Sequence, residues 1–300
     1  MNENFRIANC KLSKHIIDKI MQPTTWIYDD FTNSLKEVSN LSGDQLDLLI
    51  YLSVRQNPWG NVRGLYYKDV CLDLGFVHKA SFYNALHGLE RKGYIKINYM
   101  VSDDWECTII DNIFDKDEDD KKGYFSTNRA FLHTPDFRKL KVNEKKICIY
   151  LATAYQEQNF KEHGLKIYPE TIAKKIGIKS TFLVYGYMEN INKFFPNKRE
   201  VSKSHKEIFV LSPGNFIPFD SKGKSERELF LTHKIKHFCR RFKICYTISD
   251  LKDLIILIGQ YAQIGLGQLY GTICDVLLGY RSIEPPLINK LLSNHLSVLT

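Results

Sequence analysis

The sequence predicts a mainly helical α+β protein, with two helix-turn-helix modules that each end in a small β-hairpin, followed by a helical C-terminal domain. Two observations predict this fold class. The same succession of helical and extended patterns occurs twice, and a further series of helical segments follows a stretch rich in Pro and Gly. We expect an N-terminal extension at 1–40, the two modules at 41–114 and 123–215, and the helical domain at 216–300.

The composition is that of a globular protein. Hydrophobic residues make up 44% of the 300 positions and charged residues 25%, which supports buried cores and argues against a disordered or fibrous chain. The seven cysteines form no Cys-x-x-Cys pair, and charged residues interrupt the first residues of the chain. We therefore expect free thiols, no secretory leader, and a cytoplasmic, nucleoid-associated protein.

The positive charge is concentrated after residue 122. Residues 1–122 carry 15 basic and 19 acidic side chains, whereas 123–300 carry 27 and 15, for a net charge of +8 over the chain. A polyanion is therefore expected to contact mainly 123–215. The acidic run 115–122 separates the two regions and is expected to be an exposed linker.

The first copy of the repeated pattern begins at residue 43. Apolar residues at the helical period predict helices over 43–56 and 67–74, and a third from near 81 to 93. Alternating residues over 94–101 and 106–110, on either side of a polar turn, predict a β-hairpin.

The second copy predicts helices over 147–158, 169–176 and 179–195, with a basic hairpin at 198–211. In both copies a glycine follows the second helix with the same spacing, in Val70-x-x-x-Leu74-Gly75-Phe76 and Ile172-x-x-x-Ile176-Gly177-Ile178. Glycine favours the left-handed conformation that ends a helix before a sharp turn. Two helices joined in this way form a helix-turn-helix unit, and a following hairpin makes it a winged helix.

The second copy is preceded by a segment that carries a family resemblance. The stretch Gly123-Tyr124-Phe125-Ser126-Thr127-Asn128-Arg129-Ala130-Phe131-Leu132, running through Phe137-Arg138-Lys139-Leu140, resembles the start of winged-helix replication initiators of Gram-positive plasmids and phages. Those proteins, like the DnaD-like primosome proteins, pair winged helices with a helical C-terminal region. The resemblance implies that one module reads origin repeats, while the other supports dimerisation or a second contact.

The third helix of the second module is the expected reading helix. Ser, Thr and Asn side chains hydrogen-bond base edges, and Lys and Arg contact phosphates. The expected DNA contacts here are Lys174, Lys175, Lys179, Ser180, Thr181, Tyr185, Asn192, Lys198, Arg199, Lys203 and Lys206. The side of the helix expected to be buried is Leu183, Tyr187, Ile191 and Phe194, with Met188 on the exposed side and Ser180 or Thr181 as the cap. The alternative is a solvated polar face.

The first module offers side chains at equivalent places. These are Lys79, Ser81, Asn84, His87 and Arg91. Because this half of the chain is acidic, these residues are equally expected to contact DNA or to contact protein. The second module is expected to supply most of the affinity for DNA.

The C-terminal third predicts helices over 226–243, 249–263, 266–279 and 285–298. Gly and Gln residues interrupt the uncharged run 254–274, so a buried helical hairpin is expected instead of a membrane span. The densest cationic stretch is Lys234, Lys236, Arg240, Arg241 and Lys243, which is expected either to contact phosphates or to be a solvated helix face.

Motifs of enzyme active sites are missing from the sequence. There is no G-x-S-x-G, H-E-x-x-H or G-x-G-x-x-G, and His233, His237, Cys239 and Cys245 match no established zinc spacing. We expect a protein that is not an enzyme and that uses no metal or cofactor.

The leading functional hypothesis is a sequence-specific double-stranded DNA-binding protein that initiates plasmid- or phage-type replication. It would bind origin repeats as a homodimer or higher oligomer and recruit host helicase-loading proteins. A winged-helix transcriptional regulator is the first alternative. A protein-interaction adaptor that does not bind DNA is the second.

Overall fold

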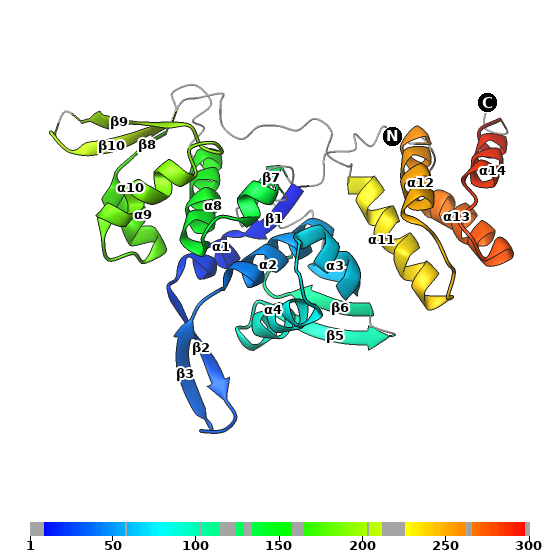
Figure 1. The fold of residues 1–300 in the computed structure, drawn as a ribbon, viewed down its shortest axis with the longest axis horizontal. Coiled ribbons are helices and arrows are strands. Elements are labelled where there is room, and N and C mark those ends of the chain that lie inside the picture. Colours follow the sequence, from blue (N-terminus) through cyan, green and yellow to red (C-terminus); the bar gives the residue numbers. More distant parts are fainter. Residues whose placement is uncertain are drawn as a thin grey trace.

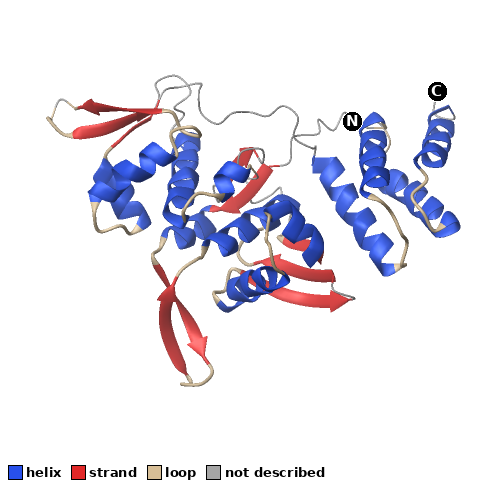
Figure 2. Ribbon diagram, viewed as in Figure 1, coloured by secondary structure: helices blue, strands red, loops and turns tan. Residues whose placement is uncertain are grey.

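A computed structural model describes residues 9–57, 59–101, 104–113, 124–128, 134–157, 165–202, 204–211, 226–261, 264 and 266–297. Within these ranges, helices alternate with small antiparallel sheets of two or three strands (Figures 1 and 2), so the expected α+β class is confirmed. The acidic run 115–122 and the side chain of Lys203 lie outside the described residues.

The N-terminal extension is folded into regular elements. Strand β1 (Asn9–Ser13) leads into helix α1 (Lys14–Met21), and β2 (Thr24–Asp29) and β3 (Ser34–Ser39) form a hairpin that projects from the body of the molecule (Figure 1). Strand β1 pairs antiparallel with β7 (Tyr124–Asn128). The segment with the initiator resemblance therefore supplies a strand that completes a two-stranded sheet with the N-terminal segment.

The first module contains the expected helices and hairpin and one further strand. Its elements are α2 (Gly43–Arg55), β4 (Asn61–Tyr66), α3 (Tyr67–Leu74), α4 (Lys79–Arg91), β5 (Ile95–Val101) and β6 (Asp104–Ile109). Strand β6 lies between β4 and β5, so the hairpin is extended to a three-stranded sheet. Strand β4 was not predicted, because its six residues are interrupted by Arg63 and Gly64 and show no clean alternation.

The second module repeats this order. After α7 (Pro135–Arg138), its elements are α8 (Val142–Glu157), β8 (Leu165–Ile167), α9 (Pro169–Ile176), α10 (Thr181–Asn190), β9 (Asn197–Val201) and β10 (Glu207–Leu211). Strand β10 lies between β8 and β9, which is the arrangement of the first module. The expected hairpin after the third helix is therefore present.

The repeated glycines adopt the expected conformation. Gly75 ends α3 with φ 70° and Gly177 ends α9 with φ 72°, both in the left-handed region. Each donates its backbone N–H to a carbonyl of the helix that it ends, Cys71 and Ala173 respectively. Side chains other than glycine rarely adopt this conformation, so the shared spacing has a backbone cause.

Helix α8 begins five residues before the predicted start at 147. The carboxylate of Glu144 accepts a hydrogen bond from the backbone N–H of Lys141 at 2.7 Å, which satisfies a donor at the start of the helix. The first turns then bury Lys145 and Lys146, whose charges concealed the helix from an analysis of apolar periodicity.

The two modules and α1 share one hydrophobic core. Its buried side chains run from Leu12 to Leu211 and include Ile16, Tyr51 and Ile149. Lys145 on α8 pairs with Asp47 on α2, with Nζ and Oδ2 2.7 Å apart and side-chain exposures of 2% and 8%. Since a buried charge is tolerated only with a partner, this pair ties the first helices of the two modules together.

The C-terminal helices form a second core. They are α11 (Glu226–Arg241), α12 (Ile248–Gln260), α13 (Leu266–Tyr280) and α14 (Pro285–Ser297), close to the predicted ranges. Leu254 and Ile258 of α12 and Leu269 and Ile273 of α13 are buried in this core, as expected, but α12 and α13 each pack mainly on α11 and α14 and not on one another as the predicted helical hairpin. None of the helices in the described part of the chain is long and apolar enough to cross a membrane.

Candidate nucleic-acid interface

Helix α10 is rotated relative to the prediction. Val184 and Met188 are fully buried, whereas Leu183, expected in the core, is 48% exposed. Ile191 and Phe194 are buried as expected and Tyr187 is half-buried, so the prediction was wrong for Leu183 and Met188. Seven consecutive residues, Phe182 to Met188, are apolar, aromatic or glycine, so the sequence leaves the helical phase undetermined over that stretch. Ser180 is at the N-cap but its side chain makes no capping hydrogen bond.

The exposed face of α10 is apolar. Phe182 is 81% exposed, and together with Leu183 it lines a groove of about 560 Å³ between the helix and strands β9 and β10. Lys141 and Arg199 contribute cations to the lining, and Glu189 and Glu207 contribute anions. The helix contains no Lys or Arg, its one amide side chain, Asn190, donates to Glu144, and Glu189 is an anion, so its surface is poorly suited to base readout.

Two of the expected reading residues make contacts within the protein. The side-chain oxygen Oδ1 of Asn192 accepts a hydrogen bond from the backbone N–H of Asn197 at 2.9 Å, which fixes the turn into β9. Tyr185 lies against Phe209 and under the Arg199 guanidinium, 4.9 Å from the ring centroid. A hydrogen bond to Glu207, with a smaller contribution from burial, raises the pKa of Tyr185. These two side chains therefore stabilise the module.

The predicted cations of the second module lie on its surface. Lys174, Lys179, Lys198 and Lys206 are exposed, and Ser180 is exposed beside them. Lys175 pairs with Asp18 of α1, with Nζ and Oδ1 2.8 Å apart. The second module thus presents positive charge on α9, on the turn before α10 and on the hairpin, and Thr181 at the start of α10 is half-buried.

Helix α4 of the first module, unlike α10, exposes polar and charged side chains. Its core side is Phe82, Ala85, Leu86 and Leu89, and its outer side exposes Lys79, Asn84, His87 and Arg91, all residues from the predicted set. Residues 84, 87 and 91 lie on one face because they are spaced three and four apart. Ser81 is half-buried. Amide, imidazole and guanidinium groups on one helical face are the groups that read base edges in a major groove.

Aromatic side chains support this face from beneath. Tyr83 of α4 stacks on His87 and meets Trp105 of β6 edge to face, with centroids 5.7 Å apart in the second contact. The Lys79 ammonium lies 4.4 Å from the ring centroid of Tyr67 on α3. The start of α4, its second turn and the hairpin are therefore held in one rigid arrangement.

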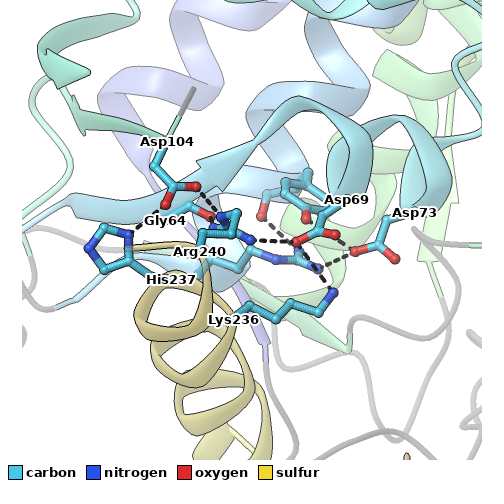
Figure 3. A network of polar contacts seen from close by, with 9 residues as sticks. Gly64, Asp69, Asp73, Asp104, Lys236, His237 and Arg240 are labelled. Carbon is cyan, nitrogen blue, oxygen red and sulfur yellow. Dashed lines mark hydrogen bonds and ion pairs between the residues drawn. The ribbon is translucent and has the colours of Figure 1, made fainter. Parts of the chain in front are cut away.

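Two acidic residues of the first module, Asp69 and Asp104, pair with basic side chains of α11. Arg240 contacts Asp69 on α3, with Nη1 and Oδ2 3.0 Å apart, and also pairs with Asp104 at the start of β6 (Figure 3). Lys236 lies 3.4 Å from the same Asp69 oxygen, and His237 Nδ1 lies 3.0 Å from Asp104 Oδ2. Asp104 is 3% exposed, so these contacts hold a nearly buried carboxylate.

This network corrects the expectation for the cationic stretch of α11. Lys236 and Arg240, expected to contact phosphate or to face solvent, bind carboxylates of the first module, and Arg240 also donates to the Gly64 carbonyl at 3.0 Å (Figure 3). Arg241 and Lys243 are exposed. The sequence contains both a cationic helix and an acidic module, which is a signal that the two could pair. It does not indicate which side chains would contact each other.

The described residues include no cluster of three or more His, Cys, Asp or Glu side chains that could hold a metal ion. His237, considered as a zinc ligand, contacts Asp104 instead. Comparisons with protein-family models, with curated proteins and with solved structures find no match to this chain.

Proposed function

We propose that both modules are winged helices and that the chain binds double-stranded DNA. Each module consists of a helix, a strand, two helices joined at a left-handed glycine, and a hairpin whose second strand lies in the middle of the sheet. A helix-turn-helix followed by a hairpin is the arrangement that inserts its last helix into a major groove.

Base readout is assigned to α4 of the first module. The observation that carries this assignment is the exposed row of Asn84, His87 and Arg91, with Lys79 at the helix start. The acidic balance that argued against this module is offset, because cations from other elements pair with Asp47, Asp69 and Asp104. This proposal reverses the expectation that the second module supplies most of the affinity.

The second module is assigned to phosphate contacts. Lys174 lies on α9 and Lys179 in the turn between α9 and α10, and Lys198 and Lys206 lie on or beside the hairpin strands. Lysine ammonium groups bind phosphates without reading sequence. Because one core joins the two modules, phosphate contacts by the second would orient α4 on the duplex.

The biological role that we propose is initiation of plasmid- or phage-type replication, at origin repeats in the cytoplasmic nucleoid, with recruitment of host helicase-loading proteins. Its support is the resemblance of 123–140 to winged-helix initiators and the pairing of two modules with a helical C-terminal domain. A transcriptional regulator built from the same modules is the alternative within the DNA-binding class.

A protein-interaction adaptor is the second candidate function. The observation that favours it is the apolar face of α10, where Phe182 and Leu183 are exposed beside a groove. An apolar patch of this kind is typical of a protein contact.

Duplex binding at several salt concentrations tests these proposals. Fluorescence anisotropy of the full chain with labelled duplexes should give an association constant whose logarithm falls linearly with the logarithm of salt concentration. Preference for origin-type repeats over promoter fragments supports initiation, and the reverse supports transcriptional regulation. Absence of duplex binding at low salt would contradict both and support the adaptor.

A further inference from the structure

The C-terminal helices contact the first module without sharing a core with it. Among the described residues, one core of buried apolar side chains runs from Leu12 to Leu211 and the other from Leu231 to Leu292, and no residue belongs to both. Helix α11 contributes to the second core and also lies against β4 of the first module. The two units are therefore joined by an interface that lies outside both cores.

Arg240 is the centre of this interface. Its guanidinium contacts three elements of the first module at once, through Asp69 of α3, Asp104 of β6 and the carbonyl of Gly64 in β4 (Figure 3). The ring centroid of Tyr66, at the end of β4, lies 4.9 Å from the same guanidinium. Because a planar guanidinium donates in fixed directions, these contacts set the position of α11 on the first module.

The charges in this interface are largely shielded from water and are balanced. The side chains of Lys236 and Arg240 are 17% and 12% exposed, and those of Asp69 and Asp104 are 18% and 3% exposed. The ring of His237 lies beside Asp104. Buried ion pairs add little net stability, because the cost of dehydration offsets the attraction, whereas loss of one partner leaves a buried charge and is strongly destabilising. The interface therefore depends on the presence of every partner.

The two carboxylates lie where they would repel a bound duplex. Asp69 is in the first turn of α3, the first helix of the helix-turn-helix, and Asp104 is the first residue of β6. The first helix of a helix-turn-helix crosses the phosphate backbone in complexes with DNA. Without α11, these residues would carry two uncompensated negative charges. With α11 in place they are paired, and Arg241 and Lys243 remain exposed at the end of that helix.

We propose that the C-terminal helical domain docks on the first module as a separable unit through Lys236 and Arg240, and that docking enables duplex binding by neutralising Asp69 and Asp104. The first half of the proposal rests on the interface alone, and the second half rests on the proposed binding of DNA by the first module. Since interfaces between domains that lack an apolar core permit relative motion, the affinity for DNA depends on the docked fraction of the chain.

Small-angle X-ray scattering of the full chain tests docking without DNA. Lys236→Gln/Arg240→Gln, the clamp variant, leaves Asp104 without its cation and should raise the radius of gyration above that of the wild type. Arg241→Gln/Lys243→Gln, the surface variant, removes the same charge from exposed positions and should leave the radius unchanged. Circular dichroism of both variants should match the wild type, because none of these side chains belongs to either core. Equal radii for the wild type and the clamp variant would overturn the proposal.

Fluorescence anisotropy with a labelled duplex tests the effect of docking on binding. The clamp variant should lower the association constant about ten-fold or more, and the surface variant less than about three-fold. Adding Asp69→Asn/Asp104→Asn to the clamp variant should restore the association constant, because no carboxylate then repels the phosphates. Scattering should show that the C-terminal domain remains undocked in this quadruple variant.

Two results of the binding experiment would overturn the proposed role of docking. Tighter duplex binding by the clamp variant would show that the docked domain covers the binding surface. Failure of Asp69→Asn/Asp104→Asn to restore binding would show that the carboxylates do not repel the duplex. A wild type that binds no duplex at low salt would contradict the proposed function and the neutralising role together, whereas the scattering comparison would still decide whether the domain is separable.

Discussion

Helices α4 and α10 occupy the same place in two modules of the same topology, yet they present opposite surfaces. α4 exposes Asn84, His87 and Arg91, whereas α10 exposes Phe182 and Leu183. The repeated fold therefore does not imply a repeated task. Under the function proposed above, the surface of the third helix, and not the presence of the module, distinguishes base readout from phosphate or protein contact.

The two modules also differ in how their charges are used. Residues 43–109 contain more acidic than basic side chains. Lys145, Lys236 and Arg240, all from other elements, pair with three of these carboxylates. In the second module, Lys174, Lys179 and Lys198 are exposed to solvent. Net charge over a stretch of sequence is thus a poor guide to the potential at a surface when ion pairs connect distant segments.

The largest effect is expected where the two modules meet. Replacing Lys145 by Met leaves Asp47 buried without its partner, which should cost about 3–5 kcal/mol in the free energy of unfolding. Urea denaturation measures this, with Lys141→Met on the exposed surface as the control. A loss below about 1 kcal/mol would show that the ion pair contributes little and that the shared hydrophobic core alone holds the modules together.

The comparison itself is tested by paired substitutions on the two helices. Asn84→Ala/Arg91→Ala on α4 should weaken duplex binding about a hundred-fold and relax sequence preference, because each removes a base contact. Lys179→Ala/Thr181→Ala beside α10 should weaken binding less than about ten-fold and leave the preference intact. Anisotropy with specific and scrambled duplexes measures both. The opposite ranking would return base readout to the second module.

The left-handed glycines offer a smaller contrast. Gly75→Ala should cost about 1–2 kcal/mol, the strain of a left-handed alanine, because its added Cβ would have no atom closer than 3.9 Å. In Gly177→Ala the Cβ would lie 2.9 Å from the Pro23 ring, so the cost should be about 1 kcal/mol larger. Thermal unfolding of both variants measures the difference. Equal costs would show that Pro23, at the base of the β2–β3 hairpin, moves to accommodate the added methyl group.

The smallest effect is expected for the hairpin of the second module. Lys198→Ala/Lys206→Ala should weaken binding to all duplexes by about five- to ten-fold and lower the slope of log affinity against log salt by about 2. Lys36→Ala/Lys252→Ala, which removes two exposed lysines elsewhere, is the control. A change in sequence preference instead of the slope would assign base contacts to these lysines.

Much of the local structure was predictable from the sequence. Helices over 67–74 and 169–176 are observed at the predicted residues, and the hairpin of β5 and β6 is close to its predicted range. Proline at the start of α9 and glycine after both helices are local signals that need no tertiary information. Strand β8 and the hairpin of β2 and β3 were missed, because the first is short and the second has no buried face to create an alternating pattern.

The sequence by itself determined the order of the main helices, the hairpin after each third helix and the repetition of the module, since these depend on local periodicity and on residues with special backbone conformations. Only the tertiary structure decided which side of α10 faces the core, because a helix of uniformly apolar residues can pack on either side. It also decided that Arg240 neutralises Asp69 and Asp104, more than 130 residues away in the chain. Such ion pairs follow from packing, which has no local signature.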